Sequence, residues 1–600
     1  MSKSKFITLD KKIEELKAIT SELDIFSVSN RMFHEMIMFT QKAKRISLNS
    51  PSRQAAYLLG IMVSQKNSGA KELTDYEYSR ISKLLNDIFS KYLKAYLPDK
   101  SEMAKGVTQA WSKPRTVSLP VFISYFFESQ KIATDEIRKD ILETNDKFES
   151  EIAKHFGLSH KDMISITDQI GELLQLNINS IYALVSKLQE RQSKLSDISA
   201  DKYDDFLEET RKECRPLLED FNKSTNEMAT FKFDDIKNID SNTLDKFKSL
   251  YVINKGEGPF IKYITDENII DESPIITTDG CLFTLASINQ VYFAIQRQIE
   301  SFFKSSKQYA DKYRKFRDRK LECDTNEAFK ILLPTNSIII ESVYENDKSS
   351  NEHDIIIKVD RTILVIEAKA APRREPLTDP NRAFTRIRDD FKRKSGIQGG
   401  CDQAIKLKSL LEKNETTILY DKKGNELLTL NKADFDDVFC ICVTKDEFGL
   451  LATDLSILLE KPHDIDYPWV VKITDLKYYF SCLKHIGKDW DYFINYLRRR
   501  IELMGCLCSS DELEIAGHYL KYDGFGKMKK GGAILTFDIS ESDIFDEIHT
   551  AQIEGQEFPL EKSIAEYSEL NRRAIFNTYV KKKRTLKSKE QKISRRRNRK

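Results

Sequence analysis

The sequence predicts a mixed α/β (α+β) protein with a large all-helical N-terminal region, an α/β domain in its second half and a mostly helical C-terminal part. Apolar residues recur at helical spacing through residues 1–245, where Gly is scarce and strand alternation is nearly absent. Farther along, one helical segment is followed by three short apolar strands within residues 306–371. The chain has 600 residues, more than one hydrophobic core organises, so roughly three to five domains are expected.

We expect five parts along the chain. These are a helical scaffold or sensing region (1–245), a connecting α/β module (246–305), an α/β domain (306–450), a mostly helical C-terminal region (451–570) and a basic disordered tail (571–600). In the first part, "TDE" at 134–136 and "SH" at 159–160 are typical helix starts. The connecting module contains a strand, a turn at Asp279-Gly280, a second strand and a helix.

The α/β domain has a regular order of elements. Its first helix is "YRKFRDRKLECDTNEAFKILL", and its strands are "NSIIIESVYE", "HDIIIKVD" and "RTILVIEAKA". A loop and a basic helix fill residues 372–395, and the helix "GGCDQAIKLKSLLEK" follows a glycine break. The next strand is "DVFCICVTK", with Cys440 and Cys442 expected in the core. Helix, three-strand meander, helix and strand together are typical of an α/β domain.

Composition favours a soluble, cytoplasmic protein. No apolar run approaches the roughly 18–20 residues that span a bilayer, so no membrane partner is expected. The first residues, "MSKSKFITLDKKIEELK", lack the apolar centre of a secretory signal. Nine Cys residues without regular spacing suit a reducing cytoplasm.

The net charge of +2 conceals an uneven distribution. Residues 571–600 contain 14 Lys and Arg and a single acid, Glu590, which gives this tail a charge of +13. Residues 1–570 therefore carry −11, because the whole chain carries +2. A tail of this kind is expected to be disordered and to attract a polyanion such as nucleic acid, although it also fits a purely solubilising segment.

The stretch "NEHDIIIKVDRTILVIEAKA", residues 351–370, contains the candidate site. If Asp360-Arg361 forms a two-residue turn, Asp354 and Glu367 lie opposite each other on one face, and alternation places Lys369 beside Glu367. Two opposed carboxylates repel each other unless a proton or cation lies between them, and oxygen ligands favour Mg²⁺ or Mn²⁺. A lysine can then orient water and offset phosphate charge, which suits phosphodiester hydrolysis.

The same residues also fit ordinary salt bridges. In this register Glu352 lies opposite Lys369 and would neutralise it, and Asp354 would pair with a neighbouring lysine. His353 alternates to the face away from Asp354, so no catalytic role is assigned to it.

This layout resembles the PD-(D/E)xK, or restriction-endonuclease-like, nuclease superfamily across residues 306–450. In that superfamily a helix precedes a strand meander, an aspartate opens one strand, and Glu-x-Lys lies on the next. Asp354 matches the aspartate and Glu367-Ala368-Lys369 matches Glu-x-Lys, while His353 replaces the usual Pro. The resemblance implies that Asp354 and Glu367 bind Mg²⁺ (or Mn²⁺) and that Lys369 positions the attacking water.

The resemblance also implies two outlying site residues. An acidic residue on the preceding helix often joins the metal ligands, and Glu327 is best placed for that role, with Glu322 and Glu341 as substitutes. Gln403, on the following helix, matches a glutamine that orients the lysine or a phosphate. One departure is Leu407, where the RecB-like branch prefers tyrosine, and it bears on the branch rather than on the superfamily.

Basic residues after the candidate site favour a polyanionic substrate. Arg373 and Arg374 follow it closely, and Arg382 and Arg386 are one helical turn apart. We expect these four arginines to contact a phosphate backbone, although each also fits a solvated basic surface.

The expected function is therefore a metal-dependent endonuclease that acts on DNA, with RNA not excluded. Its architecture is similar to that of prokaryotic defence (anti-phage) effectors, and residues 1–245 would bind a partner protein or a second copy of the chain. The rival from another class is a catalytically silent nucleic-acid-binding or scaffolding protein that retains the nuclease fold.

Overall fold

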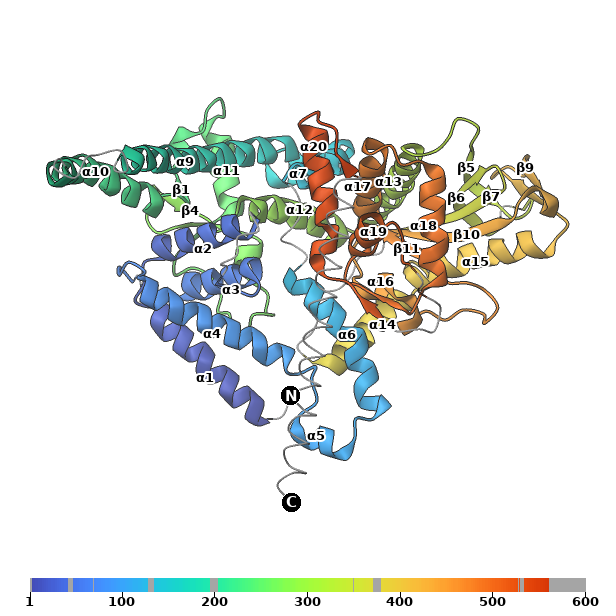
Figure 1. Cartoon of the computed structure of the whole chain (residues 1–600), viewed down its shortest axis with the longest axis horizontal. Coiled ribbons are helices and arrows are strands. Elements are labelled where there is room, and N and C mark those ends of the chain that lie inside the picture. The colour runs from blue at the N-terminus through green and yellow to red at the C-terminus, as the bar shows by residue number, and fades with distance from the viewer. Residues whose placement is uncertain are drawn as a thin grey trace, which may run out of the picture. The chain divides into compact units, whose positions relative to one another are not determined.

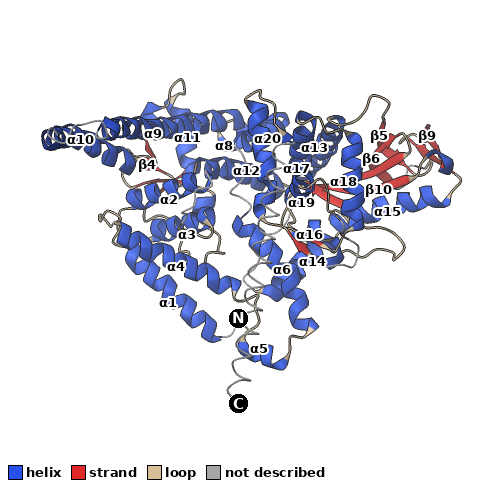
Figure 2. Cartoon of the chain, viewed as in Figure 1, coloured by secondary structure: helices blue, strands red, loops and turns tan. Residues whose placement is uncertain are grey.

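The computed structural model describes residues 3–40, 47–67, 69–127, 134–194, 203–348, 350–370, 379–526, 528 and 534–560. The basic tail at 571–600 lies outside these residues. The protein is mixed α/β, as predicted, and Figure 2 shows helices along most of the chain and one large group of strands. Within the described ranges, no helix combines the length and apolar character needed to cross a membrane.

The chain divides into two compact units. One contains residues 1–108, 125–314 and 377–380, and the other contains residues 109–124, 315–376 and 381–600. The helices up to residue 330 are α1 (Lys3–Thr20), α2 (Ile25–Thr40), α3 (Pro51–Ser64), α4 (Asp75–Leu93), α5 (Lys100–Lys105), α6 (Gln109–Phe127), α7 (Thr134–Asn145), α8 (Glu149–Phe156), α9 (His160–Lys194), α10 (Tyr203–Asn226), α11 (Ser241–Tyr251), α12 (Ile288–Ser305) and α13 (Ala310–Lys330). The predicted helix starts at 134 and 160 are confirmed.

The connecting module forms a small sheet within the first unit. Its strands are β1 (Thr230–Phe231), β2 (Val252–Asn254), β3 (Ile275–Thr277) and β4 (Phe283–Thr284), in the order β1-β4-β3-β2. The predicted sequence of strand, turn, strand and helix is confirmed by β3, β4 and α12, with Gly280 at φ +73° in the turn. Strand β1 lies within the region expected to be all-helical.

A seven-stranded mixed sheet organises the second unit (Figure 1). Its strands are β5 (Ile338–Tyr344), β6 (Glu352–Val359), β7 (Thr362–Lys369), β8 (Thr416–Tyr420), β9 (Glu426–Asn431), β10 (Asp437–Thr444) and β11 (Trp469–Lys472). The order is β11-β10-β7-β6-β5-β8-β9, with β7, β10 and β11 parallel to one another. The remaining helices are α14 (Pro380–Lys392), α15 (Ile397–Lys413), α16 (Leu450–Thr453), α17 (Ile473–His485), α18 (Trp490–Glu502), α19 (Glu512–Lys521) and α20 (Asp543–Ile553). Two short strands, β12 (Leu507–Cys508) and β13 (Leu535–Thr536), pair with each other.

The predicted hairpin between β6 and β7 is confirmed, including its register. Val359 pairs with Thr362, and the pairing continues to Ile355 opposite Ile366. Asp360 occupies the turn at φ +46°, a left-handed conformation that aspartate tolerates better than most residues. The register fixes which strand residues share a face, so it determines how the candidate site is assembled.

Alternating residues of the meander pack against different helices. On one face, Ile355, Ile357 and Ile366 join side chains from α13, α17, α18, α19 and α20 in a continuous core. On the other face, Ile356 and Val365 pack with side chains of α15, β8 and β9. The sheet therefore lies between two helical layers, and α15 covers the face that includes the even-numbered residues of β6.

The region after residue 450 belongs to the same core as the α/β domain. Strand β11 extends the sheet beside β10, and α17–α20 cover one of its faces. Glu512 stabilises this part because Arg500, Trp469 and Tyr496 all donate hydrogen bonds to its buried carboxylate, with Arg500 Nη2 2.9 Å from Oε2. The expected parts 306–450 and 451–570 thus form one structural unit rather than two.

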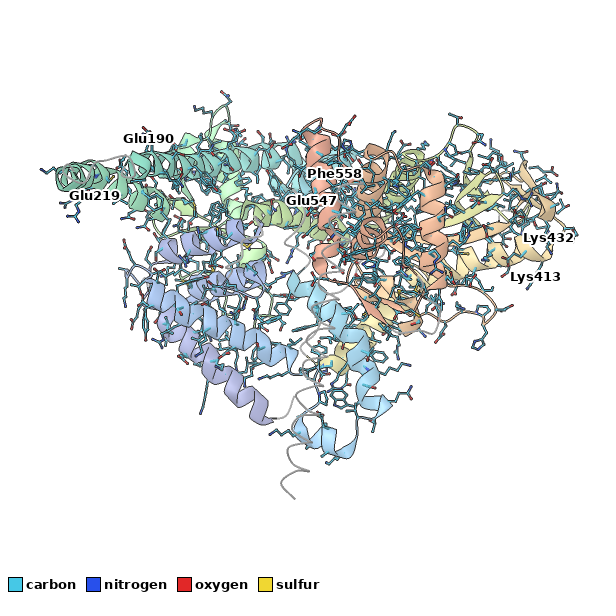
Figure 3. All side chains as sticks on the ribbon, viewed as in Figure 1. Glu190, Glu219, Lys413, Lys432, Glu547 and Phe558 are labelled. Carbon is cyan, nitrogen blue, oxygen red and sulfur yellow. The ribbon has the colours of Figure 1, made fainter. Side chains whose placement is uncertain are left out.

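The β8–β9 hairpin adds an edge to the sheet that the sequence analysis did not include. Its turn contains Gly424 at φ +83°, and Asp421 accepts backbone hydrogen bonds from Lys423 and Asn425. Figure 3 labels Lys413, the last residue of α15, and Lys432, which directly follows β9 and donates a 2.9 Å backbone hydrogen bond to Glu415. The hairpin therefore pairs with the outer side of β5 and lengthens the surface that α15 covers.

Candidate active site

Asp354, Glu367 and Lys369 meet at the ends of β6 and β7. Lys369 Nζ lies 3.0 Å from Glu367 Oε2 and 3.5 Å from Asp354 Oδ2. Glu367 is fully buried, while the side chains of Lys369 and Asp354 are 12% and 16% exposed. Asp354 Oδ2 also accepts a hydrogen bond of 2.7 Å from the backbone N–H of Ala368. The predicted juxtaposition of two carboxylates and one lysine is present, and Lys369 lies against this pair rather than pairing with Glu352.

The electrostatics of the site are those of crowded, buried charges. Burial raises the pKa of Asp354 to about 7, and the neighbouring charge of Glu367 adds to this rise, against the opposing effect of Lys369. Burial lowers the pKa of Lys369, but Glu367 and Asp354 outweigh it and raise the value above that of a free lysine. The lysine is therefore charged at neutral pH, and an added cation beside Asp354 would favour the ionised form of that carboxyl.

His353 belongs to the site, contrary to the prediction from strand alternation. Its Nδ1 lies 2.9 Å from Glu367 Oε1, and its Nε2 lies 3.1 Å from Glu345 Oε1. Alternation fails at this end of the meander, and there Ser342 on the paired strand β5 has a φ of +51°. The next residue, Val343, pairs with His353 and packs among the residues on the α15 face.

Gly400 on α15 provides the space that the side chain of Lys369 occupies. A Cβ atom on Gly400 would lie 3.0 Å from Cγ and Cε of Lys369 and 2.9 Å from Cys442 Sγ. The aliphatic stem of Lys369 is thus held directly against the helix backbone. A second glycine, Gly396, lies just before α15. A Cβ atom there would lie 2.3 Å from the carbonyl oxygen of Asp390, so this position also requires glycine.

Residues at three-residue spacing on α15 contact successive strand ends. Gly400 lies at β7, Gln403 donates a 3.4 Å hydrogen bond to the carbonyl of Glu352 on β6, and Lys406 forms a 2.7 Å ion pair with Glu345 just after β5. Three helical residues advance about 4.5 Å, close to the ~4.8 Å between neighbouring strands. Gln403 therefore borders the site, as predicted, but its amide contacts backbone rather than Lys369.

The acidic residue that α13 brings to the site is Glu322 rather than Glu327. Glu327 is 68% exposed and forms a 2.7 Å ion pair with Lys330. Glu322 is half-buried, its charge adds to the raised pKa of Asp354, and the charge of Lys369 acts to lower the pKa of Glu322. Burial raises the pKa of Glu322, and nearby carboxylates add to that rise. Five residues on a helix correspond to about 140° of rotation, so the two glutamates point in different directions.

The predicted phosphate-binding arginines divide into two pairs. Arg382 and Arg386 are exposed on α14, one turn apart as predicted. Arg373 and Arg374 lie outside the described residues. Glu341, the other substitute predicted for Glu327, accepts a hydrogen bond from Asn326 instead of joining the site.

Comparison with known proteins found no match for this chain: no protein-family model, curated protein or solved structure matches it.

The donor set fits a hard divalent cation. Two carboxylates from adjacent strands, Asp354 and Glu367, both lie against Lys369 Nζ, and a third carboxylate, Glu322, acts electrostatically on Asp354. Among the described residues, no three or more His, Cys, Asp or Glu side chains are already arranged as a complete ligand set. Mg²⁺ usually takes only one or two protein carboxylates and completes its shell with water and substrate oxygens, so Asp354 and Glu367 match the number of carboxylates that such an ion would need.

Proposed function

We propose that the chain is a metal-dependent nuclease that hydrolyses phosphodiester bonds in DNA. The observation that carries the proposal is the buried Asp354–Lys369–Glu367 cluster, in which one ammonium touches two carboxylates from adjacent strands. Mg²⁺ bound by Asp354 and Glu367 would supply Lewis-acid polarisation of the phosphate.

The residues of the chain would contribute orientation and charge. Lys369, held against α15 at Gly400, donates hydrogen bonds to the attacking water and to a non-bridging phosphate oxygen. Water then attacks phosphorus, the bond to the leaving sugar oxygen breaks, and a proton passes to that oxygen. Exposed Arg382 and Arg386 would contact the phosphate backbone from α14 without reading bases.

The order of elements around the cluster supports the same proposal. Helix α13, the β5–β7 meander, α15 and the parallel strand β10 come in the order that the PD-(D/E)xK resemblance implies, with α14 inserted before α15 and the β8–β9 hairpin inserted before β10. The resemblance also expects the aspartate to open one strand and Glu-x-Lys to end the next, which is where Asp354 and Lys369 lie. Nine free Cys residues suit a cytoplasmic enzyme.

A cleavage assay tests the proposal. Purified full-length protein is incubated with supercoiled plasmid, linear DNA and RNA, in MgCl₂ or in EDTA. The wild type is compared with Lys369→Gln and with Lys330→Gln, which removes a half-exposed lysine on α13 away from the cluster. We expect Mg²⁺-dependent breakdown of DNA by the wild type and by Lys330→Gln, and loss of at least about a hundredfold in rate for Lys369→Gln.

Two results would contradict the proposal. Nucleic acid left intact in Mg²⁺ and in Mn²⁺ would support the silent binding protein instead. Cleavage that persists in EDTA or in folded Lys369→Gln would point to a contaminant or to a different site. Cleavage of RNA alone would keep the reaction and change the substrate.

A further inference from the structure

His353 occupies a position that the proposed reaction leaves unexplained. Its ring is 1% exposed and lies between two carboxylates, Glu367 at 2.9 Å and Glu345 at 3.1 Å. Burying an imidazole between two acids is costly unless the contacts are specific, so the arrangement needs a reason beyond core packing.

The two contacts hold the ring through both of its nitrogens. Nδ1 lies against Glu367 on β7, and Nε2 lies against Glu345 just after β5. The ring therefore bridges the two carboxylates, and it cannot rotate without losing one of these hydrogen bonds.

We propose that His353 is a positioning residue that fixes the carboxylate of Glu367 for metal binding, and that Glu345 and Lys406 hold its ring from the other side. This inference rests on the proposed function, because it assigns His353 a role toward the divalent cation that the function requires.

The geometry at Glu367 shows what the positioning achieves. His353 Nδ1 contacts Oε1 of Glu367, and Lys369 Nζ contacts Oε2 from the other side at 3.0 Å. The plane of this fully buried carboxylate is thereby fixed, with Oε2 on the side that Lys369 shares with Asp354. A carboxylate already oriented by a partner loses less freedom when it binds a cation, which is how residues outside a metal's own ligand shell raise affinity.

The contacts of His353 continue through Glu345 and Lys406 to the protein surface. Glu345 is 9% exposed and binds His353 through Oε1 and Lys406 through Oε2. Lys406 is 53% exposed and lies on α15, the same helix that holds Lys369 at Gly400. One helix thus supports both sides of Glu367, the lysine side directly and the histidine side through Glu345.

Titration calorimetry with MnCl₂ on the full-length protein tests the proposal. His353→Leu removes both hydrogen bonds, whereas His353→Asn places an amide N–H near the position of Nδ1 and keeps the bond to Glu367 alone. His518→Leu is the matched control, because His518 forms a comparable contact, 3.2 Å from Glu541, elsewhere in the same unit.

We expect graded losses of Mn²⁺ affinity. His353→Leu should weaken binding by about 10- to 100-fold, the usual effect of removing a residue that orients a metal ligand, and His353→Asn by less than about tenfold. Glu345→Gln should weaken it by a smaller factor, and His518→Leu should not change it. Cleavage by His353→Leu should recover partly when Mn²⁺ is raised, because the reacting groups are still present.

Each contrary result has a separate meaning. Mn²⁺ affinity unchanged in folded His353→Leu overturns the positioning role and leaves the proposed function intact. A wild type that binds no Mn²⁺ overturns the proposed function itself. If His353→Leu does not fold, Glu345→Gln and Lys406→Met decide the question, and wild-type affinity in both overturns the proposal.

Discussion

Asp354→Asn should stabilise the metal-free protein at alkaline pH while abolishing its response to Mg²⁺. Asparagine keeps an oxygen that can accept the hydrogen bond from Ala368 N–H, but it carries no charge. In the folded wild type the pKa of Asp354 is raised from 3.8 to about 7 by burial and by Glu367, so ionising this carboxyl opposes folding. Residues that bind a substrate or cofactor often lower the stability of the empty protein in this way.

The sign and size follow from linkage. Between the two pKa values the folded state binds more protons than the unfolded state, so the wild type loses stability as pH rises through this range. The difference between the folded and unfolded pKa values of Asp354 corresponds to about 4 kcal/mol of unfolding free energy. About 2.5 kcal/mol of this is lost between about pH 5 and about pH 8. The unfolding free energy of Asp354→Asn relative to wild type should therefore rise by about that amount over the same interval.

Urea unfolding in EDTA, followed by tryptophan fluorescence, measures this difference. All three Trp residues, Trp111, Trp469 and Trp490, belong to the unit that contains the site. Asp464→Asn, which alters an exposed aspartate in that unit, should show no such pH dependence. Adding Mg²⁺ at 100 times its Kd should stabilise the wild type by about 2.7 kcal/mol and leave Asp354→Asn unchanged. A stability difference that stays constant with pH would show that folding does not raise the pKa of Asp354.

Three further substitutions test other parts of the account. Glu322→Gln should weaken Mg²⁺ binding measured by calorimetry, whereas Glu327→Gln should not. Weaker binding in Glu327→Gln alone would support Glu327 as the metal ligand, as expected from the sequence. Gly400→Ala should cost about 1–3 kcal/mol and slow cleavage, because the added methyl displaces the lysine stem; an unchanged cleavage rate would contradict this. Glu512→Ala should lower the unfolding free energy measured in urea by about 3–5 kcal/mol, because it leaves Arg500 buried without its partner. A loss below about 1 kcal/mol would contradict this, because a loss that small is typical of a solvent-exposed ion pair.

Local patterns in the sequence were sufficient for the centre of the site. The Asp360-Arg361 turn set the register of β6 and β7, and the register set which residues share a face. Asp354 and Lys369 could therefore be placed together by counting along two strands. The β8–β9 hairpin had a comparable signal in "TTILYDKKGNELLTLN", an alternating pattern around a turn of Asp, Asn and Gly, and it could have been predicted in the same way.

The positions of His353 and Glu322 depend on three-dimensional geometry that strand alternation and residue spacing do not predict. His353 contacts Glu367, and a strand pattern of period two does not anticipate this contact. The choice between Glu322 and Glu327 depends on the rotational phase of α13 against the sheet, which only the packed structure fixes. The partners of the region after residue 450 are likewise long-range, since β11 joins the sheet beside β10.

The most direct test of the central claim is a calorimetric titration of MgCl₂ into the metal-free protein at neutral pH, with Glu367→Ala beside the wild type. The account predicts a saturable binding event in the wild type that Glu367→Ala lacks, while both proteins remain folded by circular dichroism. Equal binding by both proteins, or none by the wild type, would contradict the claim that this carboxylate pair holds a divalent cation.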